Sequence, residues 1–275
     1  MYPVGITTCY GLPLSEETLF QLKAAGLDAI ELSLKLDAEQ DLSAIRKMAD
    51  AANVRIWSCH LPFRPTDVLD ISLESSLLRK NTVARFSDAI CRCADIGVDK
   101  FVVHPSTPLP LDADWNERKN CSMDTLNQLA EVAHSCGAVI AVEDMTQRCL
   151  GNSAEELAEI ISVNDKLRIC FDVNHLCNNT HRDFVRQLGD KIVTVHISDY
   201  NGVEEKHWFP GEGTNDWHEI YHLLQSIGYN GVWLYELSLD GAKMVDRGRP
   251  LTFQDFRRNA DEIFTGQPLT VITKE

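Results

Sequence analysis

Eight short apolar runs, most of them rich in β-branched residues, alternate with helical segments along this 275-residue chain. The runs are Val4–Thr8, Asp28–Leu34, Val54–His60, Lys100–His104, Ala138–Glu143, Lys166–Asp172, Lys191–His196 and Gly231–Leu237. Strands that alternate with helices at this spacing are typical of βαβ units and a parallel sheet. Eight such units match a closed (β/α)8 barrel, so we predict one barrel domain over residues 1–275 with a C-terminal extension from about 265. An open, doubly wound sheet is the alternative.

The segments between these runs carry ordinary helix signals. Ser15 followed by two glutamates predicts a helix start, and Gly26 predicts its end. Further helices are expected over about Ala38–Ala52, Leu73–Ile96, Asp216–Ile227 and Phe253–Phe264. The first run is not followed by a G-x-G-x-x-G loop, which argues against a dinucleotide-binding site.

The composition excludes several classes of protein. No apolar run reaches the roughly 18 residues of a transmembrane helix, and the start MYPVGITTCYG lacks the pattern of a signal peptide. A net charge of −15 gives no general attraction for nucleic acid or anionic membrane. Nine cysteines, an odd number scattered along the chain, indicate free thiols rather than a disulfide framework. We therefore expect a reduced, cytoplasmic protein.

Side chains able to bind a metal occur at or near the carboxyl end of seven of the eight predicted strands. They are Glu31, His60, His104, Glu143, Asp172, His196 and Glu236. Any one of them alone indicates little, because a charged side chain at a strand end is readily solvated. In a parallel barrel, however, all seven would point into one mouth. Carboxylates crowded there repel one another unless a cation lies between them.

Four of these residues come from the consecutive strands five to eight, and we predict that they bind one divalent metal ion. They are Glu143, Asp172, His196 and Glu236. Three carboxylates and one imidazole form a mostly hard donor set, which is typical of Mn²⁺, Mg²⁺ or Co²⁺, with Zn²⁺ as an alternative.

Seven short motifs, spread over most of the chain, carry a resemblance to a known family. They are Ser-Cys-His60-Leu-Pro, Val-Val-His104-Pro-Ser, Ala-Val-Glu143-Asp, Phe-Asp172-Val-Asn-His175, His196-Ile-Ser-Asp199, Pro-Gly-Glu-Gly213 and Tyr-Glu236. With these motifs the chain resembles the xylose isomerase-like TIM-barrel superfamily, which includes sugar phosphate isomerases and epimerases. The resemblance implies a (β/α)8 fold, a carbohydrate isomerase or epimerase, and a homo-oligomer.

The ketose 3-epimerase branch of that superfamily implies roles for individual residues. There the residues matching Glu143, Asp172, His196 and Glu236 bind one Mn²⁺ or Co²⁺, and the residue matching His175 contacts substrate. The two glutamates move a proton on opposite faces of the sugar. This agrees with the chemistry, since a metal that chelates a ketone oxygen and a hydroxyl stabilises an enediolate, and acid and base on opposite faces invert the carbon. A lyase or hydratase acting on a 3-keto sugar or glycoside needs the same groups and stays open.

Two departures from the 3-epimerase pattern leave a further alternative. The loop Asp199–His207 contains no arginine, where those enzymes use one to contact substrate, and His60, His104 and His207 are additional. These histidines resemble the extra zinc ligands of endonuclease IV-type abasic-site nucleases, which would also use Glu205 here. A DNA enzyme needs cations around its site. The ones visible in the mouth loops are Arg64, Arg118 and Lys206. We therefore rank the nuclease second and expect no nucleic-acid partner.

Further residues are candidates for contact with the sugar. His60, His104 and His207 are interpreted as substrate contacts or packing residues rather than as ligands of more metal ions. Arg148 could reach a substrate oxygen, and Glu31 could contact substrate or make a structural hydrogen bond. An apolar wall could be formed by Trp208, Phe209 and Phe63.

The turn Pro210–Gly213 could direct backbone N–H groups at an anion, because barrels often bind phosphate after the seventh strand. Glu212 in its centre argues against phosphate, so an unphosphorylated sugar is favoured.

Overall fold

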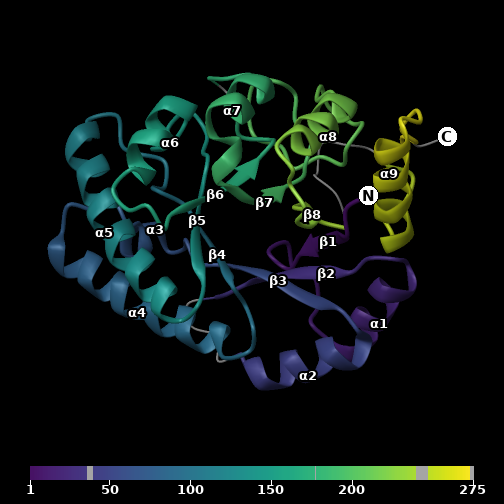
Figure 1. Cartoon of the computed structure of the whole chain (residues 1–275), viewed down its shortest axis with the longest axis horizontal. Helices are drawn as coiled ribbons and strands as arrows, with labels where there is room; N and C mark the ends of the chain where they lie inside the picture. The colour runs from purple at the N-terminus through teal and green to yellow at the C-terminus, as the bar shows by residue number, and fades with distance from the viewer. Residues whose placement is uncertain (36–39, 177, 240–246, 273–275) are drawn as a thin grey trace.

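An eight-stranded parallel sheet forms the centre of the molecule, and the helices lie around it (Figure 1). The structure is a computed structural model that describes residues 1–35, 40–176, 178–239 and 247–272. The strands are β1 (Val4–Thr7), β2 (Ala29–Ser33), β3 (Arg55–His60), β4 (Lys100–Val103), β5 (Val139–Glu143), β6 (Arg168–Asp172), β7 (Ile192–His196) and β8 (Trp233–Tyr235). Their order is β7-β6-β5-β4-β3-β2-β1-β8.

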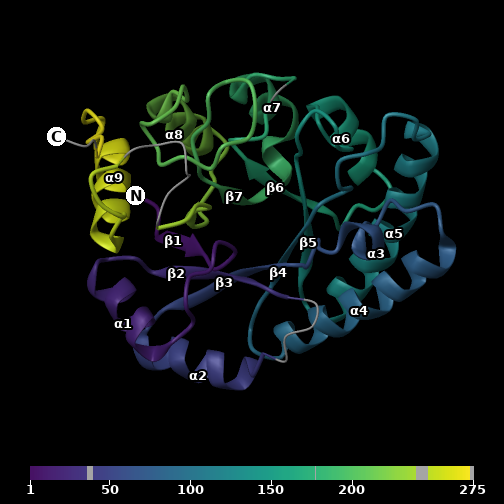
Figure 2. The ribbon, with the colours of Figure 1, turned by 180° about the vertical axis from the view of Figure 1, so that it is seen from behind.

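Helices connect successive strands and cover the outside of the sheet, as the two opposite views show (Figures 1 and 2). They are α1 (Glu16–Ala24), α2 (Leu42–Ala52), α3 (Thr66–Leu69), α4 (Ser76–Ala94), α5 (Trp115–Ser135), α6 (Ala154–Ile161), α7 (His181–Leu188), the 3₁₀ turn η1 (Gly189–Lys191), α8 (Trp217–Ser226) and α9 (Phe253–Thr265). Most of the hydrophobic core lies between this outer layer and the strands.

The barrel closes between β7 and β8. Ile197, directly after β7, forms a parallel bridge with Tyr235. Its N–H donates to Leu234 O at 2.8 Å, and its carbonyl accepts from Glu236 N at 3.0 Å. The predicted (β/α)8 barrel is thereby confirmed, and the open sheet is excluded.

All eight predicted strands are present, each within a residue or a few residues of its expected ends. The helix expected from Ala38 begins at Leu42, with Asp41 as its N-cap; Ala38 itself lies outside the described residues. The long helix expected from Leu73 begins at Ser76, because the Ser75 side chain caps it. The stretch between β3 and α4 contains the short helix α3.

Alternation along the strands divides the barrel interior into layers. Side chains point inward at every second residue of a strand. On several strands the residue two positions before a predicted site residue forms an apolar layer beneath it; these residues are Ala29, Val102, Ala141, Cys170 and Leu234. Trp57 fills the same region, and its Nε1 donates to Thr194 Oγ1 at 3.0 Å. Gly5 lies where a Cβ would meet Val232 and Leu234 side chains at 2.8 and 2.9 Å, so only glycine fits there.

Two further observations concern the cysteines and the length and polarity of the helices. The eight cysteines within the described residues are free thiols. Across those same residues, the structure shows no helix with the length and apolar character required to cross a bilayer.

The start of α9 depends on one buried carboxylate, that of Asp255. It accepts hydrogen bonds from Thr252 N at 2.8 Å and from Arg249 Nη1 at 2.6 Å, and Arg258 Nη2 lies 2.7 Å away. Burial opposes ionisation, but Arg249 and Thr252 hold the pKa of Asp255 well below its ordinary value. This capping box therefore stabilises the fold only while Asp255 is ionised.

Asp255→Asn is expected to lower the free energy of unfolding by about 1–2 kcal/mol at neutral pH. Because the folded-state pKa is lowered, the stabilisation is fully present above the ordinary carboxyl pKa of about 4. It disappears as the pH falls through the lowered value, so the two proteins should converge in acid. Urea unfolding across this range measures the difference. Asp261→Asn on the same helix, where the carboxylate is 52% exposed, should change stability far less, and equal effects of both substitutions would contradict the prediction.

Candidate active site

The seven predicted strand-end residues, together with His175, Glu205 and His207, gather at the carboxyl end of the barrel. A cavity of about 1100 Å³ opens there. Seven of these residues line the cavity directly: His60, His104, Glu143, His175, Glu205, His207 and Glu236. The parallel sheet therefore brings together residues that are far apart in sequence; Glu31 and His196, which are in contact, are 165 positions apart.

The four predicted metal ligands form one compact group. Single donor atoms of Glu143, Asp172, His196 and Glu236 all lie within 4.8 Å of one another. His196 Nδ1 is at the centre, 3.0 Å from Glu143 Oε1 and 3.1 Å from Glu236 Oε2. All four side chains are buried. Each lies at the last residue of its strand, except Glu236, which follows β8 directly.

The carboxylate oxygens of this group that accept no hydrogen bond are suited to bind a divalent metal ion. Glu143 Oε2, Asp172 Oδ2 and Glu236 Oε2 are buried and accept no hydrogen bond from the described residues. Histidine nitrogens lie 3.1–3.4 Å from these oxygens without forming a hydrogen bond. A buried carboxylate oxygen that accepts no hydrogen bond costs free energy, so such atoms are normally satisfied by a donor or a cation. Three of them around one imidazole match the hard donor set of Mn²⁺, Mg²⁺ or Co²⁺.

The electrostatics of the group also favour a cation. Burial raises the pKa of Asp172 to about 7, and Glu236 and Glu143 nearby add to the shift. Burial also opposes ionisation of Glu236, yet His196 lowers the pKa of Glu236 to about 2. The pKa of His196 is raised well above its ordinary value, because the acidic groups around it outweigh its burial. Positive charge is thus strongly stabilised at the centre of the group.

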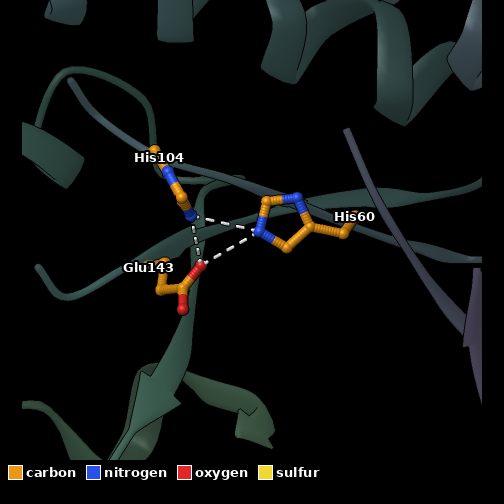
Figure 3. A group of neighbouring side chains, drawn as sticks. All are labelled: His60, His104 and Glu143. Carbon is orange, nitrogen blue, oxygen red and sulfur yellow. Dashed lines mark hydrogen bonds and ion pairs between the residues drawn. The ribbon is translucent and has the colours of Figure 1, made fainter. Parts of the chain in front are cut away.

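A second potential ligand group shares Glu143 (Figure 3). His60 Nε2 and His104 Nε2 lie 3.3 and 3.1 Å from Glu143 Oε2, and 3.1 Å from each other. His60 Nδ1 lies 2.7 Å from Leu61 O; since a carbonyl only accepts, Nδ1 carries the proton and Nε2 faces the site. Phe63 stacks on His104 with ring centroids 4.8 Å apart and lines the cavity beside this group.

A third group consists of His175, Glu205 and His207. His175 Nδ1 lies 2.8 Å from Asp144 O, and His207 Nδ1 lies 3.1 Å from Glu236 O. Both Nδ1 atoms therefore donate to backbone carbonyls, which leaves each Nε2 to face Glu205 at 3.7 and 2.6 Å. His175 is thus part of the mouth and lines the cavity.

Glu31 lies in the mouth's supporting layer and does not reach the cavity. Its side chain is completely buried, and it is not among the described residues that line the cavity. It accepts hydrogen bonds from Thr7 and Ser58 and contacts His196 Nε2 at 3.1 Å. The structure thus shows structural hydrogen bonds for Glu31 and places its side chain outside the cavity lining.

Three predicted contact residues point elsewhere. Arg148 donates from Nη2 to Leu109 O at 2.9 Å and is not among the described residues that line the cavity. Phe209 is 1% exposed and packs against Phe256 at a centroid distance of 5.3 Å, so it belongs to the hydrophobic core. Trp208 pairs through its backbone with Asp199 and also lies outside the lining. Phe63 is the one member of the expected apolar wall that faces the cavity.

The turn Pro210–Gly213 binds a carboxylate of the protein itself. Gly211 N and Gly213 N donate to Asp199 Oδ2 at 2.9 and 3.0 Å, so these N–H groups are not available to a substrate anion as the sequence had suggested. Glu212 is buried and forms a bidentate pair with Arg247. Asp199 therefore organises the loop that carries Glu205 and His207, and it is not a ligand.

Two residues of the site were missed at the sequence level. Tyr10 lines the cavity and packs against His207 with ring centroids 5.0 Å apart. Asp144 Oδ1 accepts the backbone N–H of Asp172 at 2.7 Å, while its carbonyl holds His175. The Glu143-Asp motif was visible in the sequence, but Tyr10 carried no signal beyond its place after the first strand.

Comparisons with known proteins agree with the geometry of the barrel. Residues 19–253 match the family model described as xylose isomerase-like TIM barrel. An uncharacterized protein of Methanocaldococcus jannaschii is 31% identical over 202 residues, covering 70% of this chain and 68% of its own. The L-ribulose 3-epimerase of Mesorhizobium japonicum is 26% identical over 224 residues, which cover 78% of this chain and 72% of the epimerase. A crystal structure of a D-tagatose 3-epimerase-like protein superimposes with a TM-score of 0.76 at 27% identity, covering 86% of this chain and 90% of that one.

Proposed function

Because this chain belongs to the xylose isomerase-like TIM-barrel family, we propose that it is a divalent-metal-dependent sugar isomerase or epimerase. The observation that carries the proposal is the pair Glu143 and Glu236, which approach His196 Nδ1 at 3.0 and 3.1 Å from different strands and keep one buried oxygen each without a hydrogen bond. The similarity to an L-ribulose 3-epimerase and to a D-tagatose 3-epimerase-like protein supports a small ketose as the substrate class.

Glu143, Asp172, His196 and Glu236 would hold the metal in this proposal. A divalent ion bound there would supply Lewis-acid polarisation of a substrate carbonyl and so acidify the neighbouring C–H. The apolar layer beneath the site closes the barrel interior, so substrate enters only from the cavity side. Phe63 and Tyr10 line that side and would pack against the sugar ring.

Glu143 and Glu236 would carry the proton. Both have lowered pKa values despite their burial, because of His196 and, for Glu143, also His104. Each is therefore ionised at neutral pH and able to accept a proton. In epimerisation the ionised glutamate would take the α-proton, and the other glutamate, after taking up a proton from solvent, would deliver that proton to the opposite face of the carbon; the first glutamate would then release its proton to solvent. Delivery of the proton to the neighbouring carbon would instead give isomerisation, and loss of a neighbouring group would give the lyase reaction, so the three activities share the first step.

Metal analysis with a proton-exchange assay tests the proposal. We expect purified protein to contain, or to take up, about one Mn²⁺, Co²⁺ or Mg²⁺ ion per chain. In D₂O, the loaded protein should exchange the C–H next to the carbonyl of ketoses, detected by NMR, and treatment with a chelator should stop the exchange. A folded protein that binds no divalent metal after incubation with Mn²⁺ would contradict the proposal.

A zinc phosphodiesterase of the endonuclease IV type is the second candidate, favoured by the two additional ligand groups. His60, His104 and Glu143 form one, and His175, Glu205 and His207 form the other. Its weakness is that, among the described residues, only two lysine or arginine side chains, Lys35 and Arg64, line the cavity. Arg118 is buried against Asp70, and Lys206 pairs with Glu204. Binding of two or three Zn²⁺ ions per chain and cleavage of abasic DNA would replace the sugar proposal with this one.

A further inference from the structure

The imidazole ring of His196 is oriented differently from those of His60, His175 and His207. His60, His175 and His207 each direct Nδ1 to a backbone carbonyl, so Nε2 faces the site. His196 is reversed: its Nδ1 faces Glu143 and Glu236, while its Nε2 points down to Glu31. Its orientation therefore depends on a side chain, which a substitution can change, rather than on the backbone.

The contacts of Glu31 make its carboxylate a hydrogen-bond acceptor for Nε2 of His196. Its two oxygens lie 3.1 and 3.2 Å from Nε2. Thr7 Oγ1 donates to Oε1 at 3.1 Å, and Ser58 Oγ donates to Oε2 at 2.7 Å. These contacts come from β1 and β3, the strands on either side of β2, so they hold the carboxylate in place from both sides. A carboxylate surrounded by donors requires the imidazole to contribute its N–H at Nε2.

The same contacts exclude the other roles for this residue. Glu31 has no access to the cavity, so it cannot touch a substrate there. It is also absent from the groups of described residues whose ligand atoms lie close enough to share an ion. What remains is its effect on the imidazole: with the proton on Nε2, the lone pair of Nδ1 is directed at the point between Glu143 and Glu236.

We propose that Glu31 is the positioning residue of the metal centre, which fixes the Nε2–H form and the ring orientation of His196 so that Nδ1 is available to the metal. The inference rests on the proposed function, since it requires that Glu143, Asp172, His196 and Glu236 bind a divalent ion. A carboxylate behind a ligating imidazole both orients the ring and raises its basicity, and loss of such a partner typically weakens metal binding 10–100-fold.

Glu31→Gln tests the proposal most directly. The amide has the size of the carboxylate, but an N–H₂ donor replaces one of the two oxygens, so only one of Thr7 and Ser58 can still donate to it, and the N–H₂ group lies near His196 Nε2. An amide N–H facing Nε2 favours the form of His196 with its proton on Nδ1, where the metal would bind. We expect the dissociation constant for Mn²⁺, measured by isothermal titration calorimetry on the full chain, to rise about 10–100-fold with little change in the unfolding temperature.

Three further variants separate positioning from general damage. Thr194 lies on β7, the strand of His196, and accepts a buried hydrogen bond from Trp57. Thr194→Val removes this bond, and it should lower stability and leave Mn²⁺ affinity unchanged. Ser58→Ala and Thr7→Val each remove one donor to Glu31 and should weaken Mn²⁺ binding less than Glu31→Gln does. They also provide the test if Glu31→Gln does not fold.

The outcomes distinguish this inference from the function on which it rests. Wild-type protein that binds Mn²⁺, with Glu31→Gln or both donor variants binding it equally well, would overturn the role of Glu31 and leave the metal centre intact. Wild-type protein that binds no Mn²⁺ would overturn the metal centre itself. Weaker binding in the Glu31 variants but not in Thr194→Val would support the inference.

Discussion

Glu236→Gln is expected to lower kcat by about 10²–10⁴-fold, the usual contribution of a positioned acid or base. Glutamine retains an oxygen that can face the metal, but it cannot accept or release a proton. Glu236 belongs to only one of the potential ligand groups, whereas Glu143 belongs to several, so the effect of its substitution is easier to interpret. Steady-state turnover of a ketose by the Mn²⁺-loaded variant, with its metal content measured in parallel, gives the result.

Deuterium exchange sharpens the test, because the two glutamates are proposed to serve opposite faces of the sugar. A variant without Glu236 should still exchange the proton of one epimer through Glu143, yet it should form almost none of the other epimer. Glu159→Gln, a matched change of a carboxylate that is 55% exposed on α6, should leave both reactions unchanged. Wild-type turnover by metal-loaded Glu236→Gln would remove Glu236 from the mechanism.

The arrangement of the central site could be predicted because it follows from a repeated local pattern. Each candidate ligand lies at the end of its strand or, for Glu236, directly after it, and a parallel barrel necessarily brings those ends together. Glu143, Asp172, His196 and Glu236 could therefore be grouped from sequence, and the structure places their donor atoms within 4.8 Å of one another. Period-two alternation also accounts for the apolar layer beneath them.

The roles that could not be predicted depend on long-range contacts of single side chains. Glu31 and His196 are 165 residues apart, and only the closed barrel shows that one supports the other. The turn Pro210–Gly213 has the composition of an anion site, but the anion it binds is Asp199, which local sequence does not reveal. Arg148 and Phe209 lie in the expected loops, yet tertiary packing directs them away from the cavity.

Arg118 is the case in which this difference matters most for stability. As a cation in a mouth loop it was a candidate for phosphate binding, but it is 7% exposed and lies on α5 against Asp70. Its Nη2 is 2.8 Å from Asp70 Oδ2, and its Nε donates to Ser72 O at 2.6 Å. Asp70 also accepts from Thr107 Oγ1 at 2.7 Å. One buried ion pair therefore joins α5 to the loops that follow β3 and β4.

Arg118→Met is expected to destabilise the protein by about 3–5 kcal/mol, because it leaves the Asp70 carboxylate buried without its cation. Urea unfolding followed by circular dichroism measures this loss. Arg186→Met, which breaks an exposed pair with Asp183, should cost no more than about 1 kcal/mol. An equal effect of the two substitutions would contradict the assignment.

The double variant Asp70→Asn/Arg118→Met shows whether the cost comes from the unpaired charge. Removing both charges should recover a large part of the stability lost in Arg118→Met, since a neutral amide can still accept from Thr107. If the loss persists undiminished, packing of the arginine stem rather than the ion pair holds these loops. Phe63 and His104 are carried by the same two loops. If the double variant recovers the stability lost in Arg118→Met, the ion pair between Arg118 and Asp70 holds these two loops in place and so determines the shape of the mouth, although it lies outside the cavity.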